Sequence, residues 1–196
     1  MHRKRLVVLA SGTGTNLQAL LDARDLGGDV VGVLSDRPAA LALDRARDRG
    51  IPATAVELGA DRARWEAELC ARVADHAPDL VILAGFMRVL SVGFVHRWPV
   101  INVHPSLLPA FPGAHAVEDA LAWGVKVAGV TVHFVDELVD NGPVIAQEAV
   151  DVLDDDTPAT LHARMRRVEH RLLPSVVRAF CADRVDRDGR HVRIRP

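Results

Sequence analysis

The chain has 196 residues, of which 49% are hydrophobic and 26% are charged, a composition that suits one globular domain and excludes a disordered polymer. A formal net charge of −2 at pH 7 gives no basic field for binding nucleic acid. Cys70 and Cys181 are too few for a disulfide framework and stand in no metal-binding spacing. The apolar run at 6–10 is too short for a signal peptide, and no stretch has the length of a membrane span, so we expect a cytoplasmic protein.

Short apolar runs alternate along the chain with segments of helical spacing. The predicted strands are residues 6–9, 30–34, 52–56, 80–84, 100–103, 127–135 and 144–152. The predicted helices are residues 16–23, 39–49, 62–76 and 117–123, and a long one that starts at Thr157-Pro158. This alternation predicts an α/β protein with a Rossmann-like, open, mostly parallel twisted sheet and helices on both faces.

Local signals refine several of these elements. Thr15 or Asn16 is expected to cap the first helix, and Pro174 to break or kink the last one. The strand at 144–152 is a candidate for antiparallel pairing with the strand before it. The pair Asp188-Gly189, between short apolar positions, predicts a terminal hairpin. We expect a single domain over residues 1–196.

A glycine-rich turn joins the first strand to the first helix. It consists of Gly12, Thr13, Gly14, Thr15 and Asn16. Free backbone N–H groups and the positive end of the helix dipole make such a turn an anion site, which we favour over an ordinary tight turn. Leu17 stands where the dinucleotide fingerprint has its third glycine, which counts against NAD. Asp36, after the second strand, is placed as an NAD ribose ligand would be and keeps that interpretation open.

The strand at 100–103 leads into a second candidate site. Asn102 and His104 point to the same side of this strand and lie at its carboxyl end, where open α/β sheets bind ligands. An amide can donate to a developing oxyanion, and an imidazole can move a proton near neutral pH. Taken alone, the spacing is equally compatible with a hydrogen-bonded pair in the core.

Three further features offer chemistry. The acidic loop at 136–143 contains Asp140, which would stabilise an imidazolium at His104 if the two met, although such a loop is more often a solvated turn. Residues 85–90 combine an apolar wall with one cation, which suits a flat ring system or simply the core. His115 and His133 are secondary candidates, because a lone histidine is more often structural. No group of histidines and carboxylates has metal-ligand spacing.

Four strings occur together in a specific order. They are LASGTGTNLQA at 9–19, LAGFMRVL at 83–90, NVHPSLLPAFPG at 102–113, and HFV at 133–135 leading to DNGPVI at 140–145. In these strings the chain resembles the glycinamide ribonucleotide formyltransferase family of folate-dependent enzymes, over about residues 6–180. The resemblance implies that the formyl group of the co-substrate 10-formyltetrahydrofolate passes to the amino group of 5-phosphoribosyl-glycinamide in de novo purine biosynthesis, without a metal.

The resemblance also implies roles for individual residues. The catalytic group would be Asn102, His104 and Asp140. Phosphoribosyl-glycinamide would contact Gly12, Thr13, Gly14, Thr15, Asn16, Pro109 and Glu169. The folate would contact Arg62, Met87, Arg88, Val89, Leu90, Asn102 and Asp140, with Arg64 as the alternative to Arg62. Phosphate binding would then belong to about residues 1–100, and catalysis and folate binding to about residues 100–196.

The implied chemistry agrees with the residue types. Amine attack on a formyl carbon builds negative charge on its oxygen, which Asn102 and protonated His104 would stabilise. The proton then moves from the amine to the departing folate nitrogen, directly or through a water, and Asp140 would orient that water and tune His104. The chain departs from the family pattern at Asn141, where the family usually has glycine, at the short link 96–99, and at the apolar pair 116–117.

Other functions remain as alternatives. The methionyl-tRNA formyltransferase type shares the Asn-x-His pattern but acts on tRNA through an extra C-terminal domain, which we do not expect in a chain that ends at Pro196 and is not basic. A hydrolase of formyl-folate would carry an extra N-terminal domain, which we do not expect before Leu6. A non-catalytic nucleotide-binding module would use the glycine-rich turn and Asp36. We expect small-molecule substrates, no nucleic acid, no membrane, and a monomer or homodimer.

Overall fold

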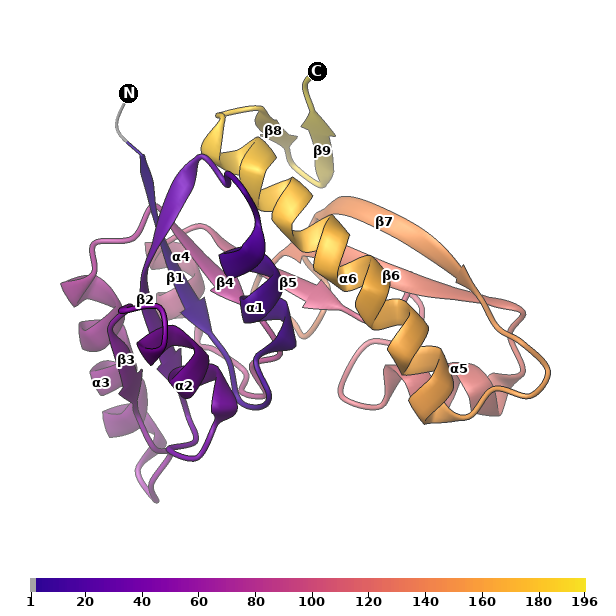
Figure 1. The fold of residues 1–196 in the computed structure, drawn as a ribbon, viewed down its shortest axis with the longest axis horizontal. Helices are drawn as coiled ribbons and strands as arrows, with labels where there is room; N and C mark the ends of the chain where they lie inside the picture. Colours follow the sequence, from indigo (N-terminus) through magenta and orange to yellow (C-terminus); the bar gives the residue numbers. More distant parts are fainter. Residues whose placement is uncertain (1–2) are drawn as a thin grey trace.

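The computed structural model describes residues 3–196 and contains a seven-stranded sheet with helices on both of its faces (Figure 1). Its strands are β1 (Lys4–Leu9), β2 (Gly28–Ser35), β3 (Ala53–Ala55), β4 (Leu80–Leu83), β5 (Val100–His104), β6 (Val127–Phe134) and β7 (Val144–Asp151). Its helices are α1 (Thr15–Asp22), α2 (Leu41–Arg47), α3 (Arg62–Asp75), α4 (Val92–Arg97), α5 (Ala116–Trp123) and α6 (Pro158–Cys181). The predicted fold class is confirmed.

The strands follow the spatial order β3-β2-β1-β4-β5-β6-β7. The strands from β3 to β5 are parallel, whereas β6 runs antiparallel to β5, and β7 antiparallel to β6, as expected for residues 144–152. The next two strands in the chain, β2 and β3, lie on one side of β1, and β4 lies on the other. The carboxyl ends of β1 and β4 therefore flank the switch point at which open α/β sheets bind their ligands.

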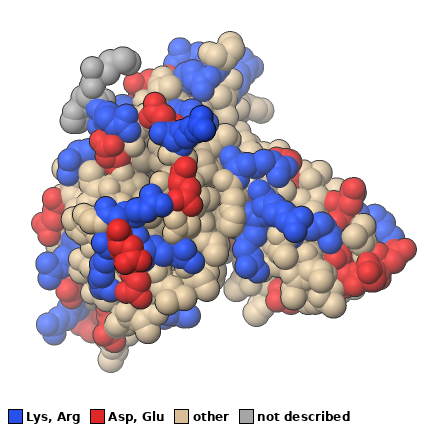
Figure 2. All heavy atoms as spheres, in the orientation of Figure 1, with Lys and Arg blue, Asp and Glu red and all other residues tan. Residues whose placement is uncertain are grey.

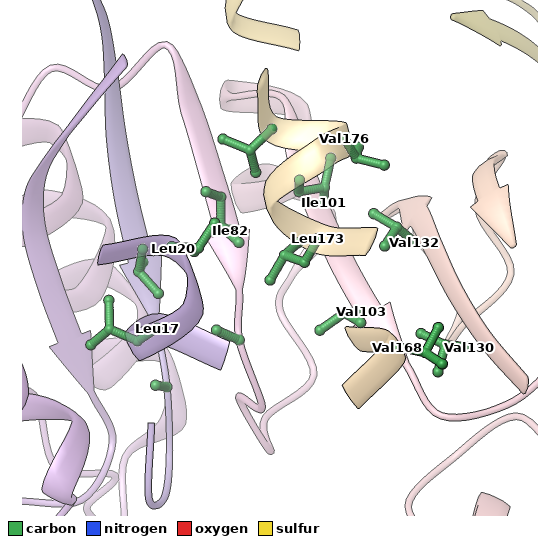
Figure 3. Packing of buried hydrophobic residues seen from close by; sticks show 14 of the residues in the cluster. Leu17, Leu20, Ile82, Ile101, Val103, Val130, Val132, Val168, Leu173 and Val176 are labelled. Carbon is green, nitrogen blue, oxygen red and sulfur yellow. The ribbon is translucent and has the colours of Figure 1, made fainter. Parts of the chain in front are cut away.

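The sheet buries an apolar cluster on each face because side chains alternate along every strand. In β1, Leu6 and Val8 face one cluster, and Val7 and Leu9 face the other. Residues of α1, α2, α5 and α6 complete the first cluster, while α3 and α4 complete the second. Figure 3 shows the first cluster, in which Leu173 of α6 packs over the sheet. The fully apolar strands predicted from the sequence are thus buried on both faces.

Three local features differ from the sequence-based expectation. The N-cap of α1 is Gly14, with a left-handed backbone (φ 70°, ψ 30°), so a cap at Thr15 or Asn16 is wrong. Pro174 lies inside α6 without ending it, because buried residues on both sides of the proline hold the helix against the sheet. The short helix α4 has no counterpart among the predicted helices; Ser91 caps it by accepting a hydrogen bond from the Phe94 N–H.

A hairpin follows α6, as the pair Asp188-Gly189 predicts. It consists of β8 (Val185–Asp188) and β9 (His191–Ile194), which pair in an antiparallel register. Figure 2 shows basic side chains gathered over this end of the molecule, whereas acidic and basic residues are interleaved over much of the rest of the visible face. Within residues 3–196, the helices are all too short or too polar to cross a membrane.

Candidate active site

A cavity of about 670 Å³ opens at the carboxyl ends of β1, β4 and β5, a size typical of sites for small molecules. Its lining residues are 12–14, 83–90, 102–105, 113–114, 116–118, 133, 135–140, 162, 166 and 169. The lining thus includes the turn after β1, the loop after β4, the end of β5, the loop after β6 and one face of α6. These segments lie far apart in the sequence and meet because the sheet brings its strand ends together.

The end of β5 presents two polar side chains to this cavity. Ile101 and Val103 point into the first apolar cluster, so Asn102 and His104 point to the opposite face. In the register between β5 and β6, His133 lies directly opposite Asn102. The Asn102 Nδ2 atom is 3.3 Å from His133 Nε2, which places a second histidine beside the predicted pair.

Asp140 joins these side chains from the loop after β6. Its Oδ1 accepts a hydrogen bond from Asn102 Nδ2 at 3.3 Å and lies 3.6 Å from His133 Nε2. Its Oδ2 lies 3.3 Å from His104 Nδ1 and accepts a bond from the Gly113 N–H at 2.8 Å. The meeting of Asp140 and His104, which the sequence left open, is therefore present in the structure.

The surroundings of Asp140 favour its ionised form. Burial raises the pKa of its carboxyl, but the hydrogen bond with His133, the charge of His104 and the Gly113 N–H outweigh burial and hold the pKa below its usual value. Asp140 also adopts a left-handed backbone with φ 50°, a conformation that residues other than glycine seldom adopt. The loop thus holds a charged carboxylate in a constrained position on the cavity floor.

The protons on the two histidines follow from their partners. His133 Nδ1 is 2.8 Å from the carbonyl oxygen of Phe134, which can only accept, so Nδ1 carries a proton. Its Nε2 faces both the Asn102 amide and the Asp140 carboxylate. His104 Nε2 is 2.9 Å from the carbonyl oxygen of Phe111, and its Nδ1 faces Asp140. Both nitrogens of His104 therefore face acceptors, and only the imidazolium can donate to both.

The glycine-rich turn is held close to α2 and α6. A Cβ atom built on Gly14 would lie 2.7 Å from the Cα of Ala42, so this position excludes any side chain. Asn16 Nδ2 donates to Glu169 Oε2 at 2.9 Å, and both side chains are buried. The Oδ1 atom of Asn16 is buried without a hydrogen-bond partner among the described residues. Asn16 and Glu169, both predicted site residues, are thus brought together, although they lie 153 positions apart in the sequence.

Asp36 is not available to a ribose. It is buried and accepts hydrogen bonds from Ser11 Oγ at 2.5 Å and from Arg88 Nε at 2.6 Å. Ser11 Oγ in turn accepts a bond from the Met87 N–H at 2.9 Å. Asp36 therefore fixes the turn after β1 to the loop after β4, and the NAD interpretation loses the free carboxylate on which it depended.

The loop after β4 supplies an apolar wall. Met87 and Val89 line the cavity and are 61% and 57% exposed, whereas Leu90 is buried. Leu138 and Val139, from the Asp140 loop, also line it and are 64% and 53% exposed. Exposed apolar side chains gathered at one cavity are typical of a surface that receives an apolar part of a ligand.

Several predicted site residues lie beside the cavity lining. Arg62 donates a hydrogen bond to the carbonyl oxygen of Val89 and stacks over Trp65, with its guanidinium 5.8 Å from the ring centroid. His115 is exposed at the N-cap of α5 without a side-chain cap bond. The other predicted residues that do not line the cavity are Thr15, Asn16 and Pro109.

Sequence reasoning missed two basic side chains. His162 and Arg166 line the cavity from α6, together with Glu169. Their spacing of four and three residues places all three on one face of the helix. This periodicity was visible in the sequence, but an amphipathic helix with polar residues on one face is ordinarily a solvated helix. Among residues 3–196, no group of three or more His, Cys, Asp and Glu side chains could hold a metal ion.

Known proteins resemble this chain along most of its length. The formyl transferase family model matches residues 4–177. Phosphoribosylglycinamide formyltransferase of Mycobacterium tuberculosis (strain H37Rv) is 48% identical over 192 residues, which cover 95% of this chain and 89% of that protein. The enzyme of the same name from Escherichia coli (strain K12) is 41% identical over 187 residues, covering 92% and 88%.

A solved structure extends the likeness to the fold. Glycinamide ribonucleotide transformylase 1 from Symbiobacterium toebii superposes with a TM-score of 0.94 at 46% identity, covering 98% of this chain and 94% of that chain. Sequence and fold therefore agree along nearly the whole length. The chain belongs to the phosphoribosylglycinamide formyltransferase family.

Proposed function

We propose that this chain transfers the formyl group of 10-formyltetrahydrofolate to the amino group of 5-phosphoribosyl-glycinamide. The observation that carries the proposal is the meeting of Asn102, His104 and His133 at the carboxylate of Asp140, on the floor of one cavity. Formyl transfer to an amine needs a donor for the developing oxyanion and a path for one proton, and this group contains both.

The phosphate of phosphoribosyl-glycinamide fits the glycine-rich end of the cavity. Gly14 places the turn at the N-terminus of α1 without a side chain in the way, and the first N–H groups of that helix carry partial positive charge. Arg166 lines the same cavity and adds a full charge. Glu169, held by Asn16, would accept hydrogen bonds from ribose hydroxyls beside the phosphate.

The folate fits the apolar wall. Met87, Val89, Leu138 and Val139 would cover the flat ring, since their exposed apolar surfaces line one cavity. The backbone of residues 87–90 is fixed by the hydrogen bond that the Met87 N–H donates to Ser11 Oγ and by the one that Arg62 donates to the Val89 carbonyl oxygen. We place phosphate binding mainly in residues 1–100, while residues from both halves line the folate end.

The catalytic step assigns one role to each side chain. The amine of the substrate attacks the formyl carbon, and negative charge develops on the formyl oxygen. Protonated His104 would stabilise that charge by turning one N–H from its present acceptor toward the formyl oxygen, and Asn102 would add a second donor by releasing one of its two long, 3.3 Å bonds. Asp140 would orient a water that carries the proton from the attacking amine to the leaving nitrogen of the folate.

A spectroscopic assay of folate deformylation tests this function. The folate spectrum should change only when 10-formyl folate and phosphoribosyl-glycinamide are both present, and glycinamide without the phosphoribosyl group should react far more slowly. Deformylation that does not need the amine would identify a hydrolase instead. No spectral change with either amine would refute the proposal.

A thermal-shift screen separates the remaining alternative. Phosphoribosyl-glycinamide and a folate analogue should each raise the Tm, because both bind the native state. NAD should leave it unchanged, since Asp36 is already bonded to Ser11 and Arg88. Stabilisation by NAD alone would favour the nucleotide-binding module.

Light scattering with and without substrates would show whether the protein acts as a monomer or a homodimer.

A further inference from the structure

The loop that carries Asp140 is folded tightly against the end of β6. The Phe134 N–H donates to the carbonyl oxygen of Pro143 at 2.9 Å, and a Cβ atom built on Gly142 would lie 1.8 Å from the Phe134 oxygen. Asn141 Nδ2 donates to Asp136 Oδ2 at 3.0 Å, a hydrogen bond between two residues of the loop itself. Within this turn, Asp140 has a left-handed backbone, a conformation that residues other than glycine seldom adopt. The position of its carboxylate therefore depends on what holds the loop.

The C-terminal hairpin contacts this loop from outside. Arg190, in the turn between β8 and β9, donates from Nη2 to the carbonyl oxygen of Asn141 at 2.7 Å. Arg187 of β8 lies over the ring of Phe134, with its guanidinium 5.5 Å from the centroid. The two arginines thus touch the loop next to Asp140 and the residue against which the loop is folded. None of the residues predicted for the site lies in the hairpin, and the family match ends at residue 177.

The hairpin is anchored firmly enough to act on the loop. Val185 and Val192 pack against the first apolar cluster, and β9 contacts β7. Backbone bonds join Arg184 to Ala179 of α6, and Arg195 to Arg184. The hairpin is therefore a fixed extension of α6 and the sheet, and its turn is not a free tail that happens to lie near the loop.

We propose that Arg190 is a positioning residue for formyl transfer, which holds the Asn141 peptide so that Asp140 stays in reach of His104 and Asn102. This inference rests on the proposed function. Arg190 touches neither Asp140 nor the cavity, so its effect passes through the backbone of Asn141. Arg187 supports the same loop at its base by covering Phe134.

Three variants test the role of Arg190. R190A should lower kcat roughly fivefold, the effect of losing one ordinary hydrogen bond, while KM for phosphoribosyl-glycinamide stays unchanged, because the glycine-rich end of the cavity is untouched. R190K keeps a donor that can reach the carbonyl oxygen and should recover most of the loss. R193A is the matched control: Arg193 lies exposed on β9 and forms no side-chain hydrogen bond or ion pair with the described residues, so it should behave as the unchanged protein.

Hydrogen exchange gives a readout that does not depend on activity. In R190A, amides of residues 136–142 should exchange several-fold faster than in R193A, with equal exchange elsewhere in the protein. Equal kcat and equal loop exchange in R190A and R193A would overturn the inference. If the unchanged protein fails to transfer formyl groups, the proposed function falls, and the exchange comparison still decides whether Arg190 holds the loop.

Discussion

The carboxylate of Asp140 lies 3.3 Å from Nδ1 of His104, whose other ring nitrogen is 2.9 Å from the carbonyl oxygen of Phe111. His104 is therefore held between two acceptors on the cavity floor. A proton on each ring nitrogen would satisfy both acceptors, and the proposed mechanism uses this protonated form beside the formyl oxygen.

Replacing His104 should nearly abolish turnover. We expect H104A to lower kcat by about a hundredfold or more, the typical cost of removing one oxyanion donor. The matched control is H115A, because His115 is exposed at the start of α5 and does not line the cavity. The amine-dependent deformylation assay measures both variants, and circular dichroism checks that they fold. Near-normal kcat in H104A would remove this residue from the mechanism.

The charge of Asp140 should persist into acid. Its pKa lies below the usual value of about 3.9, so the native state binds this proton less readily than the unfolded chain does. The stability that its ionisation contributes is present above pH 4 or so, and is lost as the pH falls through the lowered native pKa. We expect the unfolding free energies of the unchanged protein and D140N to differ at pH 6 and to converge as the pH falls below about 4.

Urea unfolding at a series of pH values measures this difference. D140N keeps the shape of the side chain, so it isolates the charge that faces His104. D140N should also lower kcat strongly at pH 7, because a neutral amide lacks the negative charge that the carboxylate presents to His104. A difference in stability that grows toward low pH would contradict the lowered pKa.

Adding a methyl group should destabilise the protein at one of two glycines in the same turn and not at the other. At Gly14, the left-handed φ and the 2.7 Å approach to Ala42 mean that alanine strains the backbone and collides with α2. We expect G14A to destabilise the protein by roughly 1–3 kcal/mol. At Gly12 a Cβ atom meets nothing within 4 Å and φ is not positive, so G12A should leave the stability almost unchanged. Denaturant unfolding compares the two, and equal losses would refute the argument.

Cys181 should be unreactive in the native protein. Burial raises the pKa of its thiol to about 11, against which the nearby Lys4 and Arg3 act only partly. Burial also raises the pKa of Cys70. At pH 8, alkylation of Cys181 should be roughly a hundredfold slower than that of a free cysteine, because the thiolate is the nucleophile. Mass spectrometry of native and urea-unfolded samples measures both sites, and fast native labelling of Cys181 would contradict the prediction.

Much of the fold could be predicted because buried parallel strands read as continuous apolar runs. Val81 and Ile82 face opposite clusters, so nothing in β4 alternates and the run stands out. The break expected at Pro174 is absent because the packing of α6 outweighs one missing backbone bond. The helix α4 is a turn and a half long, too short for its spacing to be recognised before the fold is known.

Part of the candidate site could likewise be predicted from the sequence, and part of it could not. The placement of Asn102 and His104 on one side of β5 follows from the two-residue period of a strand and could be predicted. The meeting of Asp140 with both could not, because it depends on a loop whose path is set by Phe134 and by the hairpin. His133 was undervalued for a related reason: only the antiparallel register of β6 places it opposite Asn102.

The length of α6 has a consequence for how the two substrates approach one another. Its 24 residues form one unbroken rod, ~36 Å long at the usual rise per residue. It contacts α1 beside the glycine-rich turn, and it also contacts β6, β7 and α5. Bending the molecule between its two halves would have to break this rod or tear Glu169 from Asn16. These contacts favour a fixed spacing between the glycine-rich turn and Asp140, so in the proposed reaction the approach of the amine to the formyl carbon would depend on the shapes of the substrates themselves.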